Sequence, residues 1–192
     1  MDEHQLVAGL KSRDPVAVRE LLGLYGNRLL RSACLLSGNE TEAEDLVQET
    51  ILEAFRSIHR FGGRSSVYTW LHAILLNRSR RYHRKRARLL YNDEIARQDR
   101  PSDDVATHGP DHGQVSSALK TALERLSLSH REVVILRFYE DLKIDAIAEH
   151  LGISRGTVKS RLHYAIAEIQ KILPAELNVF SGRGTNKWEQ LR

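Results

Sequence analysis

The sequence predicts an all-α protein with two small helical domains joined by a flexible acidic linker, the C-terminal domain being a helix-turn-helix. Three observations support this fold class. Apolar residues recur at spacings of three and four along most of the 192-residue chain, as in helices that bury one stripe. Capping residues divide this pattern into segments, and no β-hairpin signal interrupts it. An acidic stretch with prolines and glycines separates the two halves.

The change in composition sets the expected boundaries. We expect an N-terminal domain at residues 1–90, a linker at 91–113, a C-terminal domain at 114–173 and a polar tail at 174–192. The linker contains six acids but only two arginines. His108 and His112 lie four residues apart in it without a third ligand nearby, so we expect no metal and no other cofactor.

Composition also restricts the class of protein. A single cysteine, Cys34, excludes an intramolecular disulfide and a multi-cysteine zinc site. No apolar run approaches the ~20 residues that span a bilayer. The first residues lack the basic-then-apolar pattern of a secretory signal. We therefore expect a cytoplasmic protein with no membrane insertion.

The first predicted helix begins at Asp14-Pro15, an N-cap followed by a proline at the first helical position, and ends at Gly38. The second begins with the capping-box pattern of Thr41 to Glu44. The expected buried stripes consist of Val18, Leu21, Leu22, Tyr25, Leu29, Ala33 and Leu36 in the first helix and Val47, Ile51, Ala54, Phe55 and Ile58 in the second.

Glycines and serines break the periodicity at Phe61 to Ser66, which predicts a loop. Ser66 can cap a third helix, which begins at Val67, buries Trp70, Ile74 and Leu75, and continues into a basic run. In that run, residues 78–88, seven of eleven residues are Lys or Arg and none is acidic. Such a run attracts phosphates and favours nucleic-acid binding. A solvated helix end is the alternative.

The second half of the chain is helical again. We expect one helix with the buried stripe Ala118, Leu119, Ala122, Leu123 and Leu126. A second capping box at Ser129 to Glu132 opens a helix that carries Val133, Val134, Leu136 and Phe138.

The strongest local signal, a predicted helix-turn-helix, covers residues 144–165. A short helix with Ala148 on its inner face meets a turn at Gly152-Ile153, and a long helix then runs from about Ser154 to Leu173. Residues that are polar or too small to fill a core remain on the outer face of the long helix, and these are Arg155, Gly156, Thr157, Lys159, Ser160 and Arg161. A helix of this kind binds in the major groove of DNA. A plain helical hairpin with a basic face is the alternative.

These motifs together resemble the extracytoplasmic-function group of sigma factors. In the C-terminal half, the resemblance rests on two segments. They are Ser129-His130-Arg131-Glu132-Val133-Val134-Ile135-Leu136-Arg137 and residues 147–163, from Ile147-Ala148-Glu149 to Ser160-Arg161-Leu162-His163. In the N-terminal half, the resemblance rests on Ala43-Glu44-Asp45-Leu46-Val47-Gln48-Glu49-Thr50, Tyr68-Thr69-Trp70-Leu71 and Asn77. The matches keep the order and spacing of the family and cover about Leu6 to Leu173.

The resemblance implies a sigma factor that binds core RNA polymerase, at the clamp and the β flap, and directs it to promoter DNA. The N-terminal domain would open the minus-ten element, and the C-terminal domain would recognise the minus-thirty-five element. An anti-sigma factor is a further possible partner. Such a protein acts by recognising polymerase and DNA, so we expect no enzymatic activity and no catalytic residue.

The resemblance also assigns the site residues. Polymerase binding falls to Asp45, Gln48 and Glu49, which share one helix face; a solvated acidic surface is the alternative. Minus-ten DNA falls to Gly63, Arg64, Ser65, Ser66, Tyr68, Asn77, Arg78, Arg80, Arg81 and Arg84. Minus-thirty-five DNA falls to Ser154, Arg155, Thr157, Lys159, Ser160 and Arg161. We interpret Trp70 as a core residue rather than a base-stacking platform.

Two other functions compete with this interpretation. A conventional transcription regulator would also carry a helix-turn-helix, but it leaves the acidic face, the glycine-serine loop and the basic helix unexplained. An enzyme acting on nucleic acid would need clustered carboxylates, a His/Cys metal site or a nucleophile-base pair, none of which the sequence offers. Within the family, Val67, Arg81 and the Gly62–Ser66 loop depart from the commoner pattern, which bears on the preferred minus-ten bases.

Overall fold

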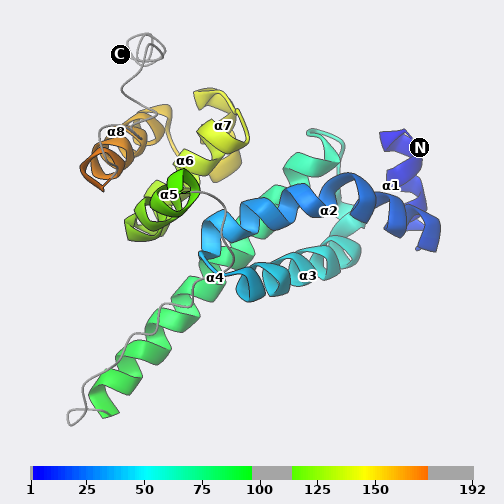
Figure 1. The fold of residues 1–192 in the computed structure, drawn as a ribbon. Helices are drawn as coiled ribbons and strands as arrows, with labels where there is room; N and C mark the ends of the chain where they lie inside the picture. The colour runs from blue at the N-terminus through cyan, green and yellow to red at the C-terminus, as the bar shows by residue number, and fades with distance from the viewer. Residues whose placement is uncertain (1, 97–113, 173–192) are drawn as a thin grey trace. The chain divides into compact units, whose positions relative to one another are not determined.

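The structure, a computed structural model, describes residues 2–96 and 114–172, and within these ranges the regular elements are all helical (Figure 1). The chain divides into two compact units, one built mainly on the helices before residue 97 and the other on those after residue 113. Each unit has its own buried apolar core, as expected of two small helical domains.

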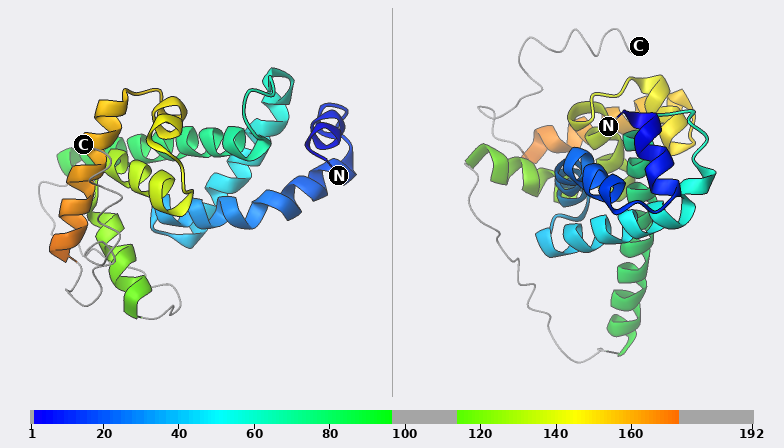
Figure 2. Two further views of the ribbon diagram at one scale, coloured as in Figure 1. Left: turned by 90° about the horizontal axis from the view of Figure 1, so that it is seen from above. Right: turned by 90° about the vertical axis from the view of Figure 1, so that its right-hand side faces the viewer.

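The first unit contains four α-helices: α1 (Glu3–Lys11), α2 (Pro15–Ser37), α3 (Glu40–Ser57) and α4 (Val67–Ala96). A short 3-10 helix, η1 (Ile58–Arg60), continues α3. Helix α4 packs along α3, and its N-terminal part is buried while its C-terminal part extends beyond the other helices (Figures 1 and 2). The largest fully buried side chains of this core are Leu6, Leu21, Leu29, Ile58, Leu71, Leu75 and Leu76.

Three of the predicted helix ends are confirmed by their hydrogen bonds. The Asp14 carboxylate accepts from the Val16 N–H at 2.8 Å, as an N-cap does. Gly38 ends α2 in the left-handed conformation, with φ of +79°, and donates to the Cys34 carbonyl at 2.9 Å. The Ser66 hydroxyl accepts from the Thr69 N–H at 3.1 Å and so caps α4.

Both predicted capping boxes lie two residues too late. Asn39 caps α3 by accepting from the Glu42 N–H, and Ser127 caps the helix that begins at Leu128 by accepting from the His130 N–H. In each case an earlier polar side chain already reaches the free N–H groups of the first turn, so the helix begins before the predicted box.

Among the stripe residues whose burial the structure describes, which leaves out Ala118 and Leu119, two lie at the surface. Leu22 is 43 % exposed, because Ala17 and Leu21 define the buried face of α2 and Leu22 lies about a quarter turn away. Phe138 is 44 % exposed. It lies in a π-helical segment, η2 (Ile135–Tyr139), whose wider turn shifts the phase of the side chains that follow.

Two departures concern the ends of the first unit. Helix α1 is absent from the predicted elements, although it buries Leu6 and Leu10 and begins with a capping box between Asp2 and Gln5. Helix α4 runs to Ala96, six residues into the segment that the sequence assigns to the linker. The rest of the linker with its two histidines, and the tail, lie outside the described residues.

The second unit contains α5 (Gln114–Arg125), α6 (Leu128–Val134), η2, α7 (Ile144–Leu151) and α8 (Arg155–Ile172). Helix α8 packs against α5, α6 and α7, and it buries Val158, Leu162, Ala165 and Ile169 at spacings of three and four. Arg131 donates to the carbonyls of Glu124 and Leu126 at 2.8 and 3.3 Å, so this side chain satisfies the C-terminal end of α5.

Candidate nucleic-acid interface

The acidic face of α3 has the arrangement that its spacing predicts. Asp45, Gln48 and Glu49 are all exposed and lie on one side of the helix. The opposite side is anchored by buried Leu46 and Thr50, whose hydroxyl donates to the Leu46 carbonyl at 2.7 Å. The three polar side chains are therefore presented outward by a helix whose other face is fixed in the core.

One member of this acidic face also contacts the basic helix. Arg78 of α4 lies 3.6 Å from a Glu49 carboxylate oxygen and 2.5 Å from one of Glu53. The side chain of Arg78 is only 21 % exposed. Two carboxylates thus hold its guanidinium at the α3–α4 junction, and this joins a predicted polymerase contact to a predicted DNA contact.

A second ion pair joins α4 to the start of α3. Arg86 contacts the Glu42 carboxylate at 2.9 Å. Tyr82 lies one turn earlier on α4, and burial, followed by the Glu42 carboxylate, raises the pKa of its phenol above the ordinary value of 10. The basic run therefore has two sides, and the side toward α3 is partly neutralised.

The outward side of the basic helix forms a continuous exposed stripe, the α4 stripe. Its members recur at spacings of three and four, so they lie above one another on the helix, and they are Asn77, Arg81, Arg84 and Arg88, with Lys85 beside them. The Arg84 Nε donates to the Arg80 carbonyl at 3.2 Å, which keeps this side chain against its own helix. A nucleic-acid strand could follow this stripe through its phosphates.

The loop before α4 is exposed from Gly62 to Ser66. Gly63 has a φ of +68°, which a residue with a Cβ rarely adopts. The turn at Gly63 exposes backbone groups together with the hydroxyl of Ser65, whereas Ser66 is used as the cap. The loop and the α4 stripe are both exposed parts of one unit and are adjacent in sequence.

Tyr68 does not belong to this exposed surface, contrary to the prediction. It is 9 % exposed, and the Arg28 guanidinium lies over its ring at 4.0 Å. The Tyr25 ring lies against it with a centroid distance of 5.8 Å. The second position of a helix can point inward or outward, and here it points inward because α2 supplies an aromatic and a cation to cover the ring.

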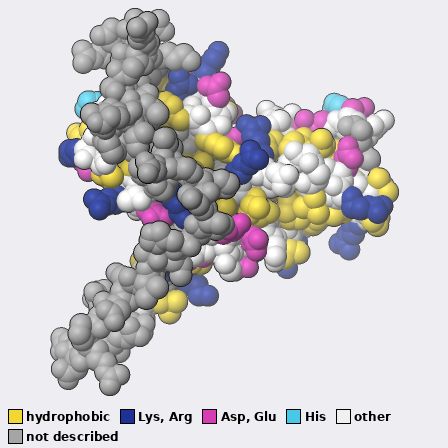
Figure 3. Space-filling model, in the orientation of Figure 1, with side chains coloured by type: hydrophobic (Ala, Val, Ile, Leu, Met, Phe, Trp, Pro, Cys, Tyr) yellow, Lys and Arg dark blue, Asp and Glu magenta, His cyan; other side chains and the backbone are white. Residues whose placement is uncertain are grey.

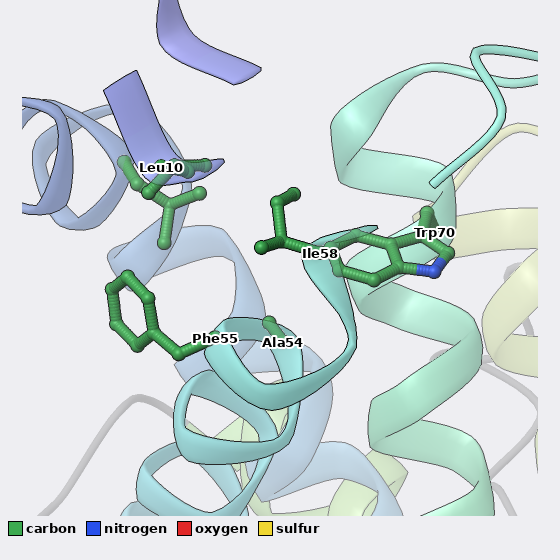
Figure 4. Close-up of a pocket in the computed structure, with 6 residues that line it drawn as sticks. Leu10, Ala54, Phe55, Ile58 and Trp70 are labelled. Atoms are coloured by element: carbon green, nitrogen blue, oxygen red, sulfur yellow. The ribbon is translucent and has the colours of Figure 1, made fainter. Parts of the chain in front are cut away.

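The interpretation of Trp70 as a packing residue agrees with the structure. Its ring lies on Phe61 with a centroid separation of 5.3 Å. Its inner edge faces Ile58 in an apolar hollow that Leu10, Leu21, Ala54 and Phe55 also line (Figure 4). Helices α1 to α4 all contribute to this hollow, so Trp70 ties the start of α4 to the rest of the unit.

Helix α1 contributes a polar contact that the sequence does not predict. A Glu3 carboxylate oxygen accepts from the backbone N–H of Val67, the first residue of α4, at 2.6 Å. A negative charge at a helix N-terminus is favourable, and this N–H has no partner within the helix. Burial and then Glu3 raise the pKa of Tyr25 above 10. No local signal reveals the contact, because 64 residues separate its two partners.

Replacing Glu3 with alanine is expected to lower the free energy of unfolding of the full chain by about 1 kcal/mol, since a charge-assisted hydrogen bond to the start of α4 is lost. Urea unfolding followed by helical circular dichroism measures this. His4→Ala, an exposed change on the same helix, serves as the control. Equal stability of the two variants would contradict a capping role for Glu3.

The turn of the helix-turn-helix is formed as predicted. Gly152 has a φ of +66° and closes α7, and Ile153 donates to the Ala148 carbonyl at 3.0 Å. The Ser154 hydroxyl then accepts from the Thr157 N–H at 3.1 Å and caps α8. Val158 is fully buried. The orientation of α8 is thus set by a glycine turn, a serine cap and an apolar anchor.

The polar side chains on the outer face of α8 differ in how far they are exposed to solvent. Ser154, Arg155, Gly156 and Ser160 are exposed, and Thr157, Lys159 and Arg161 are half-buried. The hydroxyls are engaged locally, since Ser154 and Thr157 bond to one another at 2.9 Å and Ser160 donates to the Thr157 carbonyl. Arg155 forms an ion pair with Asp145 of α7 at 2.6 Å.

Surface charge is mixed on the face shown in Figure 3, where Lys and Arg side chains lie on both units among scattered acids and apolar groups. In the described part of the chain, no group of three or more His, Cys, Asp or Glu residues could hold a metal ion. Among the same residues, no helix has the length and apolar character needed to cross a membrane.

Comparison with known families accounts for both units. Residues 21–89 match the family model described as Sigma-70 region 2, and residues 114–171 match Sigma-70, region 4. The first match contains the acidic face, the loop and the α4 stripe, and the second contains the helix-turn-helix.

Relatives match this chain over most of its length. The chain is 31 % identical over 186 residues to the ECF RNA polymerase sigma-E factor of Haemophilus influenzae, covering 91 % of this chain and 97 % of the relative. It is 31 % identical over 171 residues to the ECF RNA polymerase sigma factor SigL of Mycobacterium tuberculosis, covering 87 % and 94 %. A solved structure, the sigma factor RpoE of Bartonella quintana in complex with the anti-sigma factor NepR, matches with a TM-score of 0.68 and 30 % identity over 82 % of this chain and 97 % of that one.

Proposed function

We propose residue-level roles from one premise: the chain belongs to the extracytoplasmic-function sigma factors of the sigma-70 family. It binds core RNA polymerase and directs promoter-specific transcription initiation, with promoter melting in region 2 and minus-thirty-five recognition in region 4. The observation that carries the roles below is that one chain combines an exposed acidic face, an exposed loop with a basic stripe, and a capped helix-turn-helix.

The proposed working parts keep the expected division into 1–90, 91–113, 114–173 and 174–192, with α4 extending to Ala96. The protein acts by recognition rather than by catalysis, and we place its action in the cytoplasm with the polymerase. By analogy with its structural relative, we propose that it also binds an anti-sigma factor.

Asp45, Gln48 and Glu49 form the proposed contact with the polymerase clamp. Their exposure and common orientation leave them available to a large partner. Carboxylates presented to basic groups steer association and fix the register of an interface. Arg78 offsets part of the charge of Glu49, so Asp45 carries the less compensated carboxylate.

Minus-ten opening falls to the loop and the α4 stripe. Unstacking a base costs a few kcal/mol, and a protein offsets this cost by capturing displaced bases and holding the freed strand. We assign base capture to Gly63, Arg64 and Ser65, next to the capping Ser66, and strand binding to Asn77, Arg81 and Arg84 of the stripe, with Arg80 beside it. Tyr68 and Arg78 instead support this surface from inside, one through aromatic packing and the other through its two carboxylate partners.

Minus-thirty-five recognition falls to the start of α8. Arg155 is the proposed base contact, since an arginine can pair bidentately with guanine in the major groove. Lys159 and Arg161 are proposed phosphate contacts, and the hydroxyls of Ser154, Thr157 and Ser160 line the same face. We propose that this unit also rests on the flap of the β subunit.

Arg155→Ala is expected to relax preference at one base pair of the minus-thirty-five element, at a cost of about 1–3 kcal/mol there. Lys159→Ala is expected to weaken binding to all sequences and to reduce the salt dependence. In vitro transcription with core polymerase over a library of minus-thirty-five sequences measures both. If Arg155→Ala lowered activity equally on every sequence, Arg155 would be a phosphate contact.

A further inference from the structure

An exposed ion pair connects the two helices of the helix-turn-helix. Asp145 lies in the first turn of α7, and Arg155 is the first residue of α8. Arg155 Nε is 2.6 Å from Asp145 Oδ1, and each side chain is 68 % exposed. The contact therefore forms at the surface, on the residue proposed to recognise a base.

The pair contributes little to holding α7 against α8. That packing comes from buried Ile147 and Leu151 on α7 and from buried Val158 and Leu162 on α8. Ion pairs between exposed side chains add little stability, because water screens the charges and two long side chains must be ordered. A structural explanation of the pair is thus weak.

The position of the acid is unfavourable for DNA binding in itself. Lys143 lies two residues before Asp145, and Lys159 and Arg161 lie on α8, so basic side chains that attract phosphates surround the acid together with the exposed Asp141 and Glu149. A lone carboxylate here would repel them. Its pairing with Arg155 offsets the repulsion of phosphates and points to a use of the carboxylate in orienting the arginine.

That use follows from the chemistry of arginine. A free arginine side chain samples many rotamers, and fixing it at a base edge costs conformational entropy. A carboxylate at Nε restrains the side chain before DNA arrives and leaves the terminal Nη groups to pair with guanine O6 and N7. The nearby hydroxyls of Ser154 and Thr157 already bond to one another, which leaves Arg155 as the strongest donor at the start of α8.

We propose that Asp145 is a positioning residue that orients Arg155 toward one base pair of the minus-thirty-five element. The inference rests on the proposed base contact of Arg155. It predicts that Asp145 affects sequence discrimination rather than general affinity for DNA.

The test measures discrimination across the minus-thirty-five library with the full chain bound to core polymerase. Asp145→Ala is expected to reduce discrimination by about twofold to fivefold, the effect of losing an exposed ion pair. The loss should fall at the same base pair that Arg155→Ala relaxes. The double variant should match Arg155→Ala alone, because the carboxylate acts only through the arginine. Affinity for unrelated DNA should stay equal or rise, since a negative charge is removed.

Glu149→Ala is the matched control, because Glu149 is an exposed acid one turn later on α7. It should leave discrimination unchanged. Asp145→Asn, which keeps the side-chain shape, repeats the test if alanine weakens α7, and circular dichroism verifies the fold.

Two results would overturn the inference in distinguishable ways. If Asp145→Ala and Asp145→Asn leave discrimination unchanged or sharpen it while Arg155→Ala relaxes one base pair, Asp145 does not position Arg155 and the base contact stands. If Arg155→Ala itself relaxes no single base pair, the proposed base contact fails, and the role of Asp145 fails with it.

Discussion

Replacing both Asp45 and Glu49 with arginine is expected to weaken binding to core RNA polymerase by about 100-fold, because like charges placed together at an interface cost several kcal/mol. Both side chains are exposed, so the helix should remain folded. Arg78 keeps its closer partner, Glu53, when Glu49 is reversed. Fluorescence anisotropy of the labelled full chain with core polymerase, in the absence of DNA, measures the change.

Glu44→Arg on the same helix is the control for this prediction. It reverses an exposed charge one turn before Gln48, at the edge of the proposed face, and should change the affinity less than the double variant does. Native helicity of the double variant combined with unchanged affinity for core polymerase would remove Asp45 and Glu49 from the clamp contact.

Exchange of the loop Gly63–Ser66 for the matching loop of a related sigma factor is expected to change the preferred minus-ten bases. A good base contact contributes about 1–3 kcal/mol of discrimination, so each altered position should change its preference roughly fivefold to 150-fold. The loop is exposed, and the residues after it anchor α4 in the core. The incoming loop must keep a capping side chain at position 66, because Ser66 caps α4.

In vitro transcription over randomised minus-ten sequences measures the loop exchange, with polymerase binding and minus-thirty-five preference measured in parallel. Polymerase binding and minus-thirty-five preference should both stay unchanged. Arg84→Ala is the contrast, because loss of a phosphate contact should lower activity evenly over the minus-ten library. An active chimera with the original base preference would assign specificity to the helix around Asn77 instead of the loop.

Local sequence was sufficient to predict most of the helical architecture. Proline, glycine and serine signals act on neighbouring backbone groups, so Asp14, Gly38, Ser66 and Gly152 could be assigned without a tertiary structure. Where two possible caps lie close together, as at Asn39 and Thr41, the local pattern did not choose between them.

Sequence by itself therefore determined the helical class, the order of the two units, the turn of the helix-turn-helix and the family to which these motifs belong. Only the tertiary structure decided which polar side chains are engaged and which are available. It buried Tyr68 under Arg28, paired Arg78 with Glu53, and placed Asp145 against Arg155. The physical reason is that a helix pattern gives the side-chain phase around one axis, whereas a partner comes from another helix whose rotation and distance depend on how the core packs.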